Sequence, residues 1–479
     1  MITKEQKDNL FLLVKSLTKS EKRQFKLYVG RLGVNSDSKF LKLFNLLDKA
    51  SGYDETAIIK SGIVKKQQIA NVKAHLYKQS LKILDKAKEL AIVNEEKNAA
   101  FEIIELEKII ESQYITRSIS TRADELAMQA KEISSLNVIA SKLSNLSLQL
   151  YSIILKTGYV KNEEESLLVT DYFNKRLPKF DIAKVGFREK LWFYKAHLWY
   201  SFLLQDFLNC YKYASKWVDL FYQNPSMINL NPVFFLKGNN YLLEAIFFIR
   251  NKPKFIEKLT EFQATANADN FPKDENVASL VFLYTNFHKI NAHFIDGSFN
   301  EGLSLIPQIE KELIPFKTKI DAHHKMVFYY KFASMHFGAG NNKECIKYLD
   351  KIISNKTLSM REDLLCFSRV LNLVAHYEAG LDYHLETLLR STYKFLIKMN
   401  DLHEVQKEMI KFIRGLQDIY PQDLKKEFKK LLEVLKQYED HPYERRAFLY
   451  LDIISWLESK IENKPVGQVI KDKYLENYA

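Results

Sequence analysis

Apolar residues recur along this chain with the spacing of an amphipathic helix. One example consists of Phe101, Ile104, Leu106, Ile109, Ile110 and Tyr114. Residues spaced in this way form one stripe of a helix, which can pack against a neighbour. No segment has the sustained apolar–polar alternation of a strand, and Asp296-Gly297 is the single dipeptide of the type that closes a two-residue hairpin. The pattern therefore predicts an all-α protein.

Helix-breaking turns recur at intervals of roughly 40–48 residues, the sign of a repeat. They fall near Arg117, Thr157, Asp206, Asn251, Gly297, Gly340, Gly380 and Pro421. A second series of breaks consists of Pro178, Pro225, Pro272 and Pro315. Each proline follows a turn by roughly 18–21 residues, and proline cannot continue a helix but suits the first turn of the next one. The two series predict helical hairpins in tandem, separated by proline-containing loops.

One of these hairpins has the residue pattern of a known repeat. Ala333 is the small residue of its first helix, Gly340 begins its turn, and Cys345 is the small residue of its second helix. This stretch resembles a tetratricopeptide repeat, and residues 203–214 and 294–306 look similar. The period here is longer than the 34 residues of that family, and the Trp-Leu-Gly signature is missing. HEAT-type repeats, whose period is closer, therefore remain an alternative subclass.

The resemblance covers roughly residues 95–440. It implies a right-handed superhelical array of about eight helix-turn-helix hairpins and brings no catalytic residue with it. Because every repeat buries its apolar faces on its neighbours, such an array needs a cap at each end. We therefore expect a basic N-terminal helical module at 1–93, the repeats at 94–440, a C-terminal capping helix at 441–463 and a polar tail at 464–479.

The composition agrees with this architecture and indicates a compartment. The 14 glycines and 10 prolines are about half the usual share, as expected for long helices with few tight turns. No apolar stretch approaches the ~20 uninterrupted residues that span a bilayer, and the N-terminus lacks the pattern of a signal peptide. Cys210, Cys345 and Cys366 lie far apart, which is typical of buried free thiols in a reducing compartment. We expect a soluble cytoplasmic protein without membrane insertion.

Positive charge is concentrated near the N-terminus. The first 90 residues contain 19 Lys and Arg against nine Asp and Glu, a net charge of +10, whereas the whole chain carries +12. Such a concentration indicates a separate module with its own partner. Within it, the capping and stop signals predict helices at residues 18–31, 38–50, 55–60 and 65–93.

The last two of these helices have the outline of a helix-turn-helix, whose lysines would contact phosphates. The positions expected to face the core are Ile69, Val72, Leu76 and Ile83, with Lys66 and Lys73 on the opposite side. The candidate polyanion-binding residues are Lys22, Arg23, Lys26, Lys65, Lys66, Lys73 and Lys78. The competing interpretation is an ordinary solvated lysine-rich surface, because arginine, the favoured reader of guanine, is nearly absent here.

Sequence motifs for catalysis are missing from the chain. There is no phosphate-binding GxxxxGK[ST], no HExxH, no GxSxG and no Rossmann fingerprint. The 11 histidines include no pair spaced by four residues, the spacing that would place two metal ligands on one helix face. We therefore expect no catalytic residue, no metal site and no cofactor, and hence a protein that is not an enzyme.

Aromatic residues are abundant, with 26 Tyr, 32 Phe and 4 Trp. Residues 191–202 are aromatic on every face of one predicted helix, and core packing is the simplest interpretation. The alternative is a concave groove that captures a partner helix or an extended peptide. The candidate partner-binding residues are Trp192, Trp199, Tyr200 and Tyr330.

Three functions are compatible with these features. The first is a protein-binding scaffold or adaptor that holds a protein or peptide in the repeat groove. The second is a regulator associated with nucleic acid, in which residues 1–93 bind DNA or RNA while the repeats sense a peptide or protein. This layout resembles that of peptide-responsive regulators that pair a helix-turn-helix with such repeats. The third is a structural protein whose basic module docks on an acidic assembly such as the ribosome.

Overall fold

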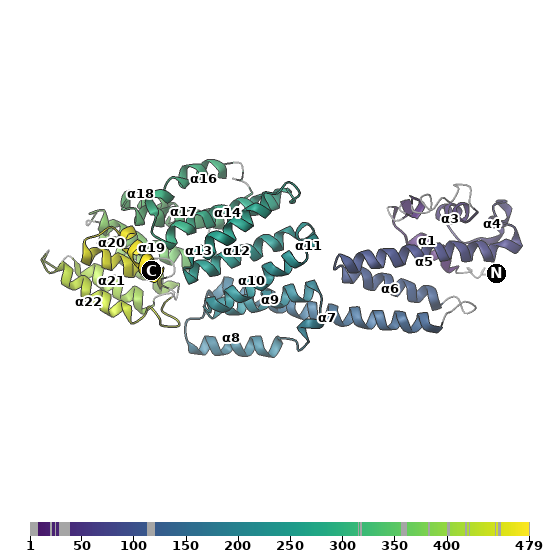
Figure 1. Ribbon diagram of the computed structural model, residues 1–479, viewed down its shortest axis with the longest axis horizontal. Helices are drawn as coiled ribbons and strands as arrows, with labels where there is room; N and C mark the ends of the chain where they lie inside the picture. The colour runs from purple at the N-terminus through teal and green to yellow at the C-terminus, as the bar shows by residue number, and fades with distance from the viewer. Residues whose placement is uncertain are drawn as a thin grey trace. The chain divides into compact units, whose positions relative to one another are not determined.

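A computed structural model gives the structure of most of the chain. It describes residues 8–19, 22–23, 25–27, 39–112, 120–314, 316, 319–355, 362–381, 384–399, 403–416, 419–420, 422–445, 447–448 and 452–478. Every regular element among these residues is a helix (Figure 1), which confirms the all-α prediction. The chain divides into two compact units, residues 1–140 and 141–479.

The first unit is built around one long helix. Its described elements are α1 (Asn9–Ser16), α3 (Lys39–Lys49), α4 (Glu55–Lys60), the 3-10 turn η1 (Lys66–Gln68), α5 (Ile69–Val93), α6 (Lys97–Ser112) and the beginning of α7 (Ser120–Thr157). The helices predicted at 38–50, 55–60 and 65–93 are thus confirmed. Asp54 caps α4 by accepting hydrogen bonds from the amides of Thr56 and Ala57, the role that fixes a helix start.

The first unit extends beyond residue 93, where the sequence placed its end. Ala91 at the end of α5 packs with Ala100 and Ile104 of α6 and with Leu126 and Ile133 of α7. These small and branched side chains let three helices approach one another closely. The division between the units therefore falls inside α7, at Ala140 and Ser141.

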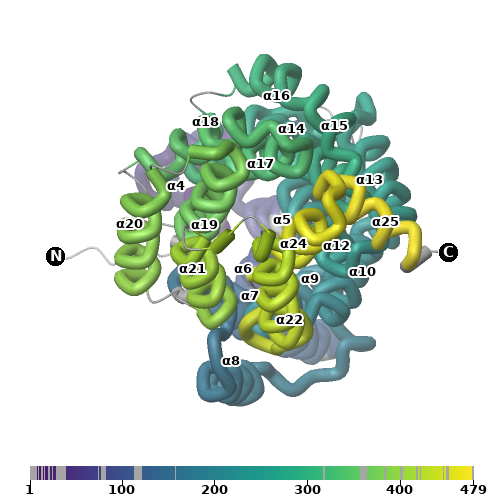
Figure 2. The backbone as a smooth tube through the Cα atoms, turned by 90° about the vertical axis from the view of Figure 1, so that its left-hand side faces the viewer, coloured from purple at the N-terminus to yellow at the C-terminus, as the bar shows by residue number. Residues whose placement is uncertain are grey.

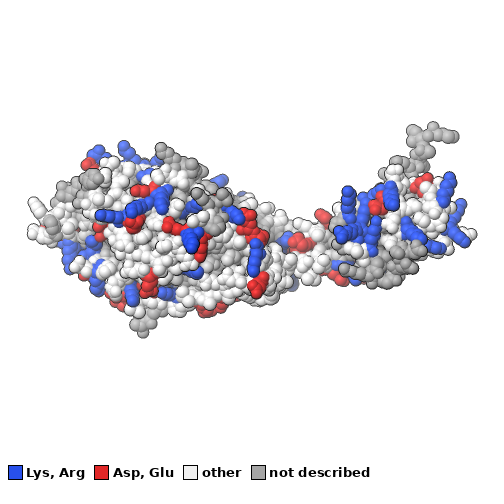
Figure 3. All heavy atoms as spheres, turned by 90° about the horizontal axis from the view of Figure 1, so that it is seen from above, with Lys and Arg blue, Asp and Glu red and all other residues white. Residues whose placement is uncertain are grey.

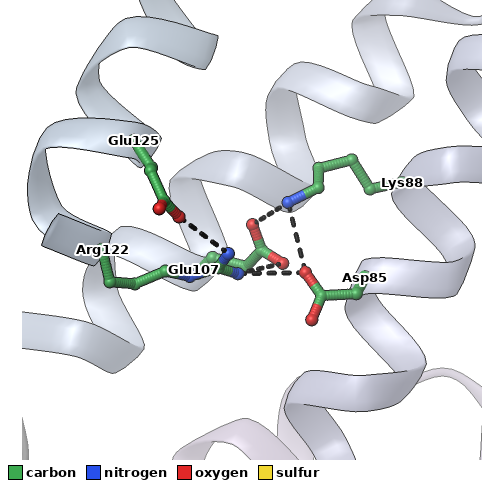
Figure 4. A network of polar contacts seen from close by, with 5 residues as sticks. All are labelled: Asp85, Lys88, Glu107, Arg122 and Glu125. Carbon is green, nitrogen blue, oxygen red and sulfur yellow. Dashed lines mark hydrogen bonds and ion pairs between the residues drawn. The ribbon is translucent and has the colours of Figure 1, made fainter. Parts of the chain in front are cut away.

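Buried charges also connect these three helices (Figure 4). Glu107 of α6 is only 1% exposed. Its carboxylate accepts a hydrogen bond from Lys88 of α5 at 2.6 Å and lies 3.4 Å from Arg122 of α7. Asp85 of α5 lies 3.0 Å from the same guanidinium, and Glu125 lies 3.7 Å from it. Because a buried charge is costly without its partners, this cluster fixes the register of the three helices.

The helix α7 is long and apolar enough to cross a membrane by length and composition, and it alone qualifies within the part of the chain that the structure describes. The qualifying window has a mean hydropathy of 1.3, and 28% of it is buried. One such helix is weak evidence for a membrane span, because core helices of soluble proteins meet the same criteria. The cytoplasmic location therefore stays a prediction.

The second unit is a succession of helical hairpins. Its elements are the end of α7, α8 (Glu163–Arg176), η2 (Ile182–Lys184), α9 (Phe187–Leu203), α10 (Phe207–Gln223), α11 (Ser226–Leu230), α12 (Pro232–Ile249), α13 (Lys252–Ala266), α14 (Glu275–Ile295), α15 (Phe299–Gly302), α16 (Leu305–Leu313), α17 (Ala322–Gly338), α18 (Asn342–Ile353), α19 (Glu362–Glu378), α20 (Leu385–Lys398), α21 (Glu404–Gly415), α22 (Leu424–Lys436), α24 (Ile453–Glu462) and α25 (Val466–Tyr478). Consecutive labelled helices pack against each other from α8 to α16 and from α17 to α25, and α15 also packs against α17.

Five hairpin turns share one backbone geometry. Each has a residue with left-handed φ between 57° and 79° directly after its first helix: Gln205, Arg250, Gly297, Gly340 and Gly380. After four of them, the next amide reaches back to a carbonyl of the first helix, as in the bond of 2.8 Å from Asn341 to His336. This is the Schellman arrangement, which ends a helix. The turns predicted near residues 206, 251, 297, 340 and 380 are confirmed.

The prolines mark the other connections. Pro178 lies between α8 and α9, Pro225 caps the short α11 between two hairpins, and Pro272 lies between α13 and α14. All three therefore separate hairpins as the sequence predicted. Pro315 and the turn expected near residue 117 lie outside the described residues. The turn expected just before Pro421 lies between α21 and α22, where Ile419 and Tyr420 are not helical.

The core of the second unit lies between the stacked hairpins and is rich in aromatic rings. Trp217, Phe221, Phe235 and Phe255 are fully buried. Gly238 lets α12 approach α10, since a Cβ at this position would lie 2.9 Å from the indole of Trp217. Figure 2 shows the helices following one another around a curve, from α8 through α10, α14 and α20 to α22, with α24 inside the curve.

The described residues from Arg445 to Tyr478, here called the C-terminal clasp, contact the turns of successive hairpins. Arg445 donates a hydrogen bond to the carbonyl of Gln205, and Asp452 lies 3.4 Å from Arg250. The clasp thus returns to hairpins that precede it by some 200 residues.

Its two helices continue this contact along the array. Trp456 of α24 donates a hydrogen bond of 2.8 Å to Glu378 at the end of α19. Gly467 of α25 meets the turn at Gly297 so closely that a Cβ on Gly297 would lie 2.5 Å from the Gly467 carbonyl oxygen. Gly467 also lies near the carbonyl of Gly338, the last residue of α17. The clasp therefore reaches five hairpins.

This arrangement changes the expected C-terminal organisation. Within the predicted capping helix at 441–463, Ile453–Glu462 form α24, and Ala447 and Phe448 are helical as well, but Asp452 is not. The predicted polar tail at 464–479 instead contains the helix α25, whose Val469 and Ile470 are buried. Apolar residues three and four positions apart give this helix a face that packs, despite its polar composition.

Candidate binding cavity

The second unit contains a cavity of about 650 Å³. Its walls come mainly from α9, α12, α14 and α17, the first helices of four successive hairpins, and from the C-terminal clasp. On α12 the lining residues include Lys237, Tyr241, Glu244 and Phe248, which share one helix face because three or four positions separate them. The cavity therefore lies along the inner faces of the hairpins. Its volume is in the range of sites for drug-sized ligands.

Aromatic rings form much of the wall. The Trp199 indole meets Tyr241 edge to face with ring centroids 4.9 Å apart, and Tyr151 lies 4.7 Å from it. Burial raises the pKa of the Tyr241 and Tyr284 hydroxyls, so both stay protonated near neutral pH. Such rings supply large apolar contact area with little loss of conformational entropy on binding.

A chain of polar side chains crosses the cavity wall. Lys331 of α17 donates a hydrogen bond of 2.5 Å to the carboxamide oxygen of Asn291. The amide nitrogen of Asn291 lies 3.4 Å from Nδ1 of His288, and Nε2 of His288 lies 2.9 Å from the carboxamide oxygen of Asn240. Burial lowers the pKa of His288 to about 3. The histidine is therefore neutral, with Nδ1 accepting and Nε2 donating.

Three lysines on the inner helix faces have lowered pKa values. Burial lowers the pKa of Lys331 and of Lys195 to about 8, and it also lowers the pKa of Lys237. Lys237 and Lys331 line the cavity, and Lys195 lies one helical turn before Trp199 on α9. The positive charge of Lys237 further lowers the pKa of Lys195. Among the described residues, none of the three has a carboxylate within 4.0 Å.

The other charged groups of the wall include one ion pair and one contact between a histidine and a carboxylate. Arg250 lies 3.4 Å from Asp452, and His324 lies 2.8 Å from Asp321. Glu244 of α12 is the third carboxylate of the wall. Its negative charge raises the pKa of Lys331 and so partly offsets the effect of burial. Lys237 of α12 and Lys331 of α17 therefore form no direct ion pair among the described residues.

Two hydrogen-bond donors on the wall also lack a partner. The indole Nε1 of Trp199 and the hydroxyl of Ser334 are buried, and neither has a hydrogen-bond partner among the described residues. Buried donors of this kind are uncommon in folded proteins, and a bound ligand or water is the usual partner. Both groups could donate to the same kind of acceptor as the two lysines.

The C-terminal clasp forms one side of the cavity. Phe448, Asp452, Val466 and Ile470 all belong to its lining. The first helices of the hairpins and the clasp are far apart in the sequence, so periodicity could not show that they share a site.

The four predicted groove residues have different surroundings. Trp199 and Tyr330 are buried and line the cavity, whereas Trp192 and Tyr200 do not. Trp192 packs edge to face on a phenylalanine of α12, and a lysine lies over its ring. Tyr200 stacks on Phe173 with centroids 4.2 Å apart and shares a hydrogen bond with α8. The α9 aromatic run therefore serves the packing between helices as well as the cavity.

The lysines that face the cavity were not among the predicted site residues. Lys237 and Lys331 both lie next to or near aromatic residues in the sequence, as in Tyr329-Tyr-Lys-Phe332. A lysine within an aromatic run on a buried helix was therefore the signal in the sequence. Periodicity alone does not show which lysines lack an acidic neighbour.

The candidate polyanion-binding residues of the first unit fall into two groups. Lys22 lies 3.0 Å and Lys26 3.7 Å from the Asp48 carboxylate. Lys73 forms an ion pair with Asp8 and is partly buried, so the expectation that it lies on the open face is wrong. Its neighbours on α5 explain this, because Ile69 and Leu76 are buried and Val72 and Ile83 partly so.

The second group is available to solvent. Arg23, Lys65 and Lys66 are exposed and form no ion pair among the described residues. The side chain of Lys78 lies outside the described residues. Figure 3 shows Lys and Arg side chains close together on the visible face of the first unit, with few Asp or Glu among them.

The three cysteines all lie in the second unit. Cys210, Cys345 and Cys366 are buried free thiols, as predicted, and burial raises the pKa of the first two. Where the chain is described, no three His, Cys, Asp or Glu residues are grouped so as to hold a metal ion. Comparison of the chain with protein-family models, curated proteins and solved structures gives no match.

Proposed function

We propose that this chain is a non-catalytic binding protein. In this proposal the second unit is a tetratricopeptide-like superhelical array that holds a segment of a partner protein. The observation that carries the proposal is the cavity along the inner faces of four successive hairpins. Helical arrays use their inner faces in this way because each repeat adds one stripe of side chains to a continuous surface.

The chemistry of the wall supports a peptide segment as the ligand. Aromatic rings such as Trp199 and Tyr241 can bury apolar side chains, while Asn240 and the α17 lysine offer hydrogen bonds for polar groups. An apolar wall with a few placed polar groups is the usual composition of a specific site.

Site-specific cross-linking tests this function. A photoreactive benzoylphenylalanine at Leu280, on the cavity wall, should give one defined protein adduct in a native cell lysate. The same residue at Leu208, which is 70% exposed on the second helix of a hairpin, is the matched control and should not. If neither position yields an adduct, or if both yield the same mixture, the proposed function is wrong.

A second function, association with nucleic acid, is favoured by the exposed basic face of the first unit. Lys65 and Lys66 lie at the start of the α5 segment, where a helix-turn-helix would present its second helix to DNA. Fluorescence anisotropy of the 479-residue chain with duplex DNA across a salt series tests it. Replacing both lysines by Glu should weaken binding and lower the salt slope by roughly 0.9 for each phosphate that the protein no longer neutralises. Lys216→Glu, at an exposed lysine of the second unit, should leave binding unchanged. No binding at low salt would exclude this function.

A further inference from the structure

The cavity wall contains two lysines, Lys237 and Lys331, that form no ion pair among the described residues. Lys331 is enclosed by aromatic rings, with its ammonium nitrogen 5.8 Å from the centroids of Phe287 and Phe294. Of its three N–H donors, one is bound by Asn291, which leaves two for a ligand. Lys237 makes no hydrogen bond or ion pair among the described residues.

Lysines of the second unit that lie nearer the solvent occur with and without an ion pair. Half-exposed Lys254 and exposed Lys347 each pair with a glutamate three residues away on the same helix, whereas exposed Lys216 has no ion pair among the described residues. The cavity lysines are less accessible to water, yet they lack such a pair. The carboxylate whose charge acts on Lys331 is Glu244 of the same wall, but the two form no direct ion pair. A cation that is withdrawn from water without a direct ion pair is costly. Groups held at such a cost cluster at functional sites.

We propose that the cavity binds an apolar ligand that carries one anionic headgroup. Lys331 holds the headgroup, and Lys237 adds a second positive charge to the same wall. Trp199 Nε1 and the Ser334 hydroxyl are further donors of that wall that have no hydrogen-bond partner among the described residues. The aromatic wall encloses the apolar body. This inference rests on the proposed function in one respect, because it uses the same cavity.

The neutral state of His288 agrees with this assignment. Its Nδ1 accepts from Asn291, which turns the carboxamide oxygen of Asn291 towards Lys331. The network therefore orients the ammonium group without neutralising it. A carboxylate in place of Asn291 would have satisfied the charge of the lysine and left nothing for an anion.

A pair of fluorescent dyes isolates the contribution of the charge. The anion 8-anilinonaphthalene-1-sulfonate and the neutral N-phenyl-1-naphthylamine share one ring system and differ in the sulfonate. The 479-residue chain should bind each dye at one site. Lys331→Met should weaken the sulfonate dye by at least about tenfold, the range expected for loss of a charged hydrogen bond. The same variant should change the affinity of the neutral dye by less than about twofold.

Two further variants locate the site. Leu280→Trp, which fills the cavity, should abolish the binding of both dyes. Lys216→Met removes an exposed lysine of α10 and should change neither affinity. The inference is overturned if Lys331→Met leaves the sulfonate dye unaffected, if Lys216→Met weakens it equally, or if the chain binds neither dye.

Competition with the wild-type chain identifies the source of the headgroup and needs no variant. Laurate should displace the sulfonate dye, whereas dodecanol at the same concentration should not. The apolar peptide Leu-Phe-Leu-Phe, blocked at its amino end, is compared as free acid and as amide. Displacement by the acid but not the amide indicates a peptide carboxyl end, and displacement by laurate alone indicates a small organic acid. Equal displacement by dodecanol and laurate would contradict the inference. It would leave the proposed function standing, because the cross-linking at Leu280 does not depend on charge.

Discussion

Replacing Lys331 by Met should stabilise the second unit while it weakens anion binding. Burial lowers the pKa of this lysine from 10.5 to about 8, and each pKa unit corresponds to about 1.36 kcal/mol. The charged form therefore costs at most about 3 kcal/mol in the folded protein at neutral pH. Methionine fits among Phe287 and Phe294, but it leaves the oxygen of Asn291 without its donor, which costs about 1–2 kcal/mol. We expect a net gain of about 1–2 kcal/mol at pH 7.

The gain should depend on pH in a defined direction. Below pH 8 both the folded and the unfolded wild-type chain carry the charge, so its full cost is present. Between about pH 8 and pH 10.5 the folded state releases the proton first. The unfolded state then binds more protons, and the stability of the wild type rises with pH. The advantage of Lys331→Met should therefore shrink towards pH 10 and become a small disadvantage.

Urea unfolding followed by tryptophan fluorescence measures this effect. The four tryptophans, Trp192, Trp199, Trp217 and Trp456, all belong to the second unit, so the signal reports that unit alone. Lys216→Met serves as the control for loss of an exposed charge and should change stability by less than about 0.5 kcal/mol. A destabilised Lys331→Met at pH 7, or a gain that does not vary between pH 7 and pH 10, would refute the reasoning.

Three further predictions concern other parts of the chain. Gly297→Ala should cost about 1–3 kcal/mol more than Gly340→Ala in the same urea assay. Both glycines have left-handed φ, but only at Gly297 would the new Cβ meet the clasp backbone; equal costs would contradict that contact. Glu107→Ala should cost about 3 kcal/mol because buried Lys88 loses its closest carboxylate and keeps only Asp85, at 3.3 Å. Amide hydrogen exchange of α6 should become much faster in this variant. If the α6 amides are as well protected as in the exposed-site control Glu344→Ala, the network does not stabilise α6. Asp48→Asn should release Lys22 and Lys26 from their ion pairs. The salt dependence of DNA binding should then become steeper, as expected for up to about two additional phosphate contacts. An unchanged slope would exclude these lysines as contacts.

The hairpin architecture could be predicted because turn chemistry is local. Gly297, Gly340 and Gly380 adopt the left-handed conformation that glycine tolerates best. Gln205 and Arg250 adopt the same conformation without being glycine. There the following Asp and Asn, which cap the next helices, were the visible signals.

The cavity could be predicted only in part, because its chemistry depends on long-range contacts. The aromatic pattern identified Trp199 and Tyr330, which are ordinary members of an inner helix face. It could not separate them from Trp192, whose partner lies on a neighbouring helix. Lys237 and Lys331 stand out because no carboxylate of the described residues lies within ion-pair distance of them, and this is visible only once the neighbouring helices are in place.

The C-terminal helix was missed for a related reason. After the Asn463-Lys-Pro465 break, the segment looked too polar to pack. Its apolar residues are few, and their burial depends on a turn at Gly297, about 170 residues earlier. Local hydrophobicity is a poor guide when one small face docks on a preformed surface.

The C-terminal clasp has a consequence for the order in which the protein matures. Each helical hairpin packs mainly on the hairpins next to it in the sequence. The hairpins can therefore fold one after another as the chain leaves the ribosome. The hydrogen bond between Arg445 and Gln205, however, joins residues 240 positions apart. At a synthesis rate of about 5–20 residues per second, a nascent chain carries its first hairpins for tens of seconds with this side of the cavity missing. Nascent chains and premature-stop products that lack α24 and α25 should therefore bind no cavity ligand, so ligand occupancy reports whether the clasp has been synthesised.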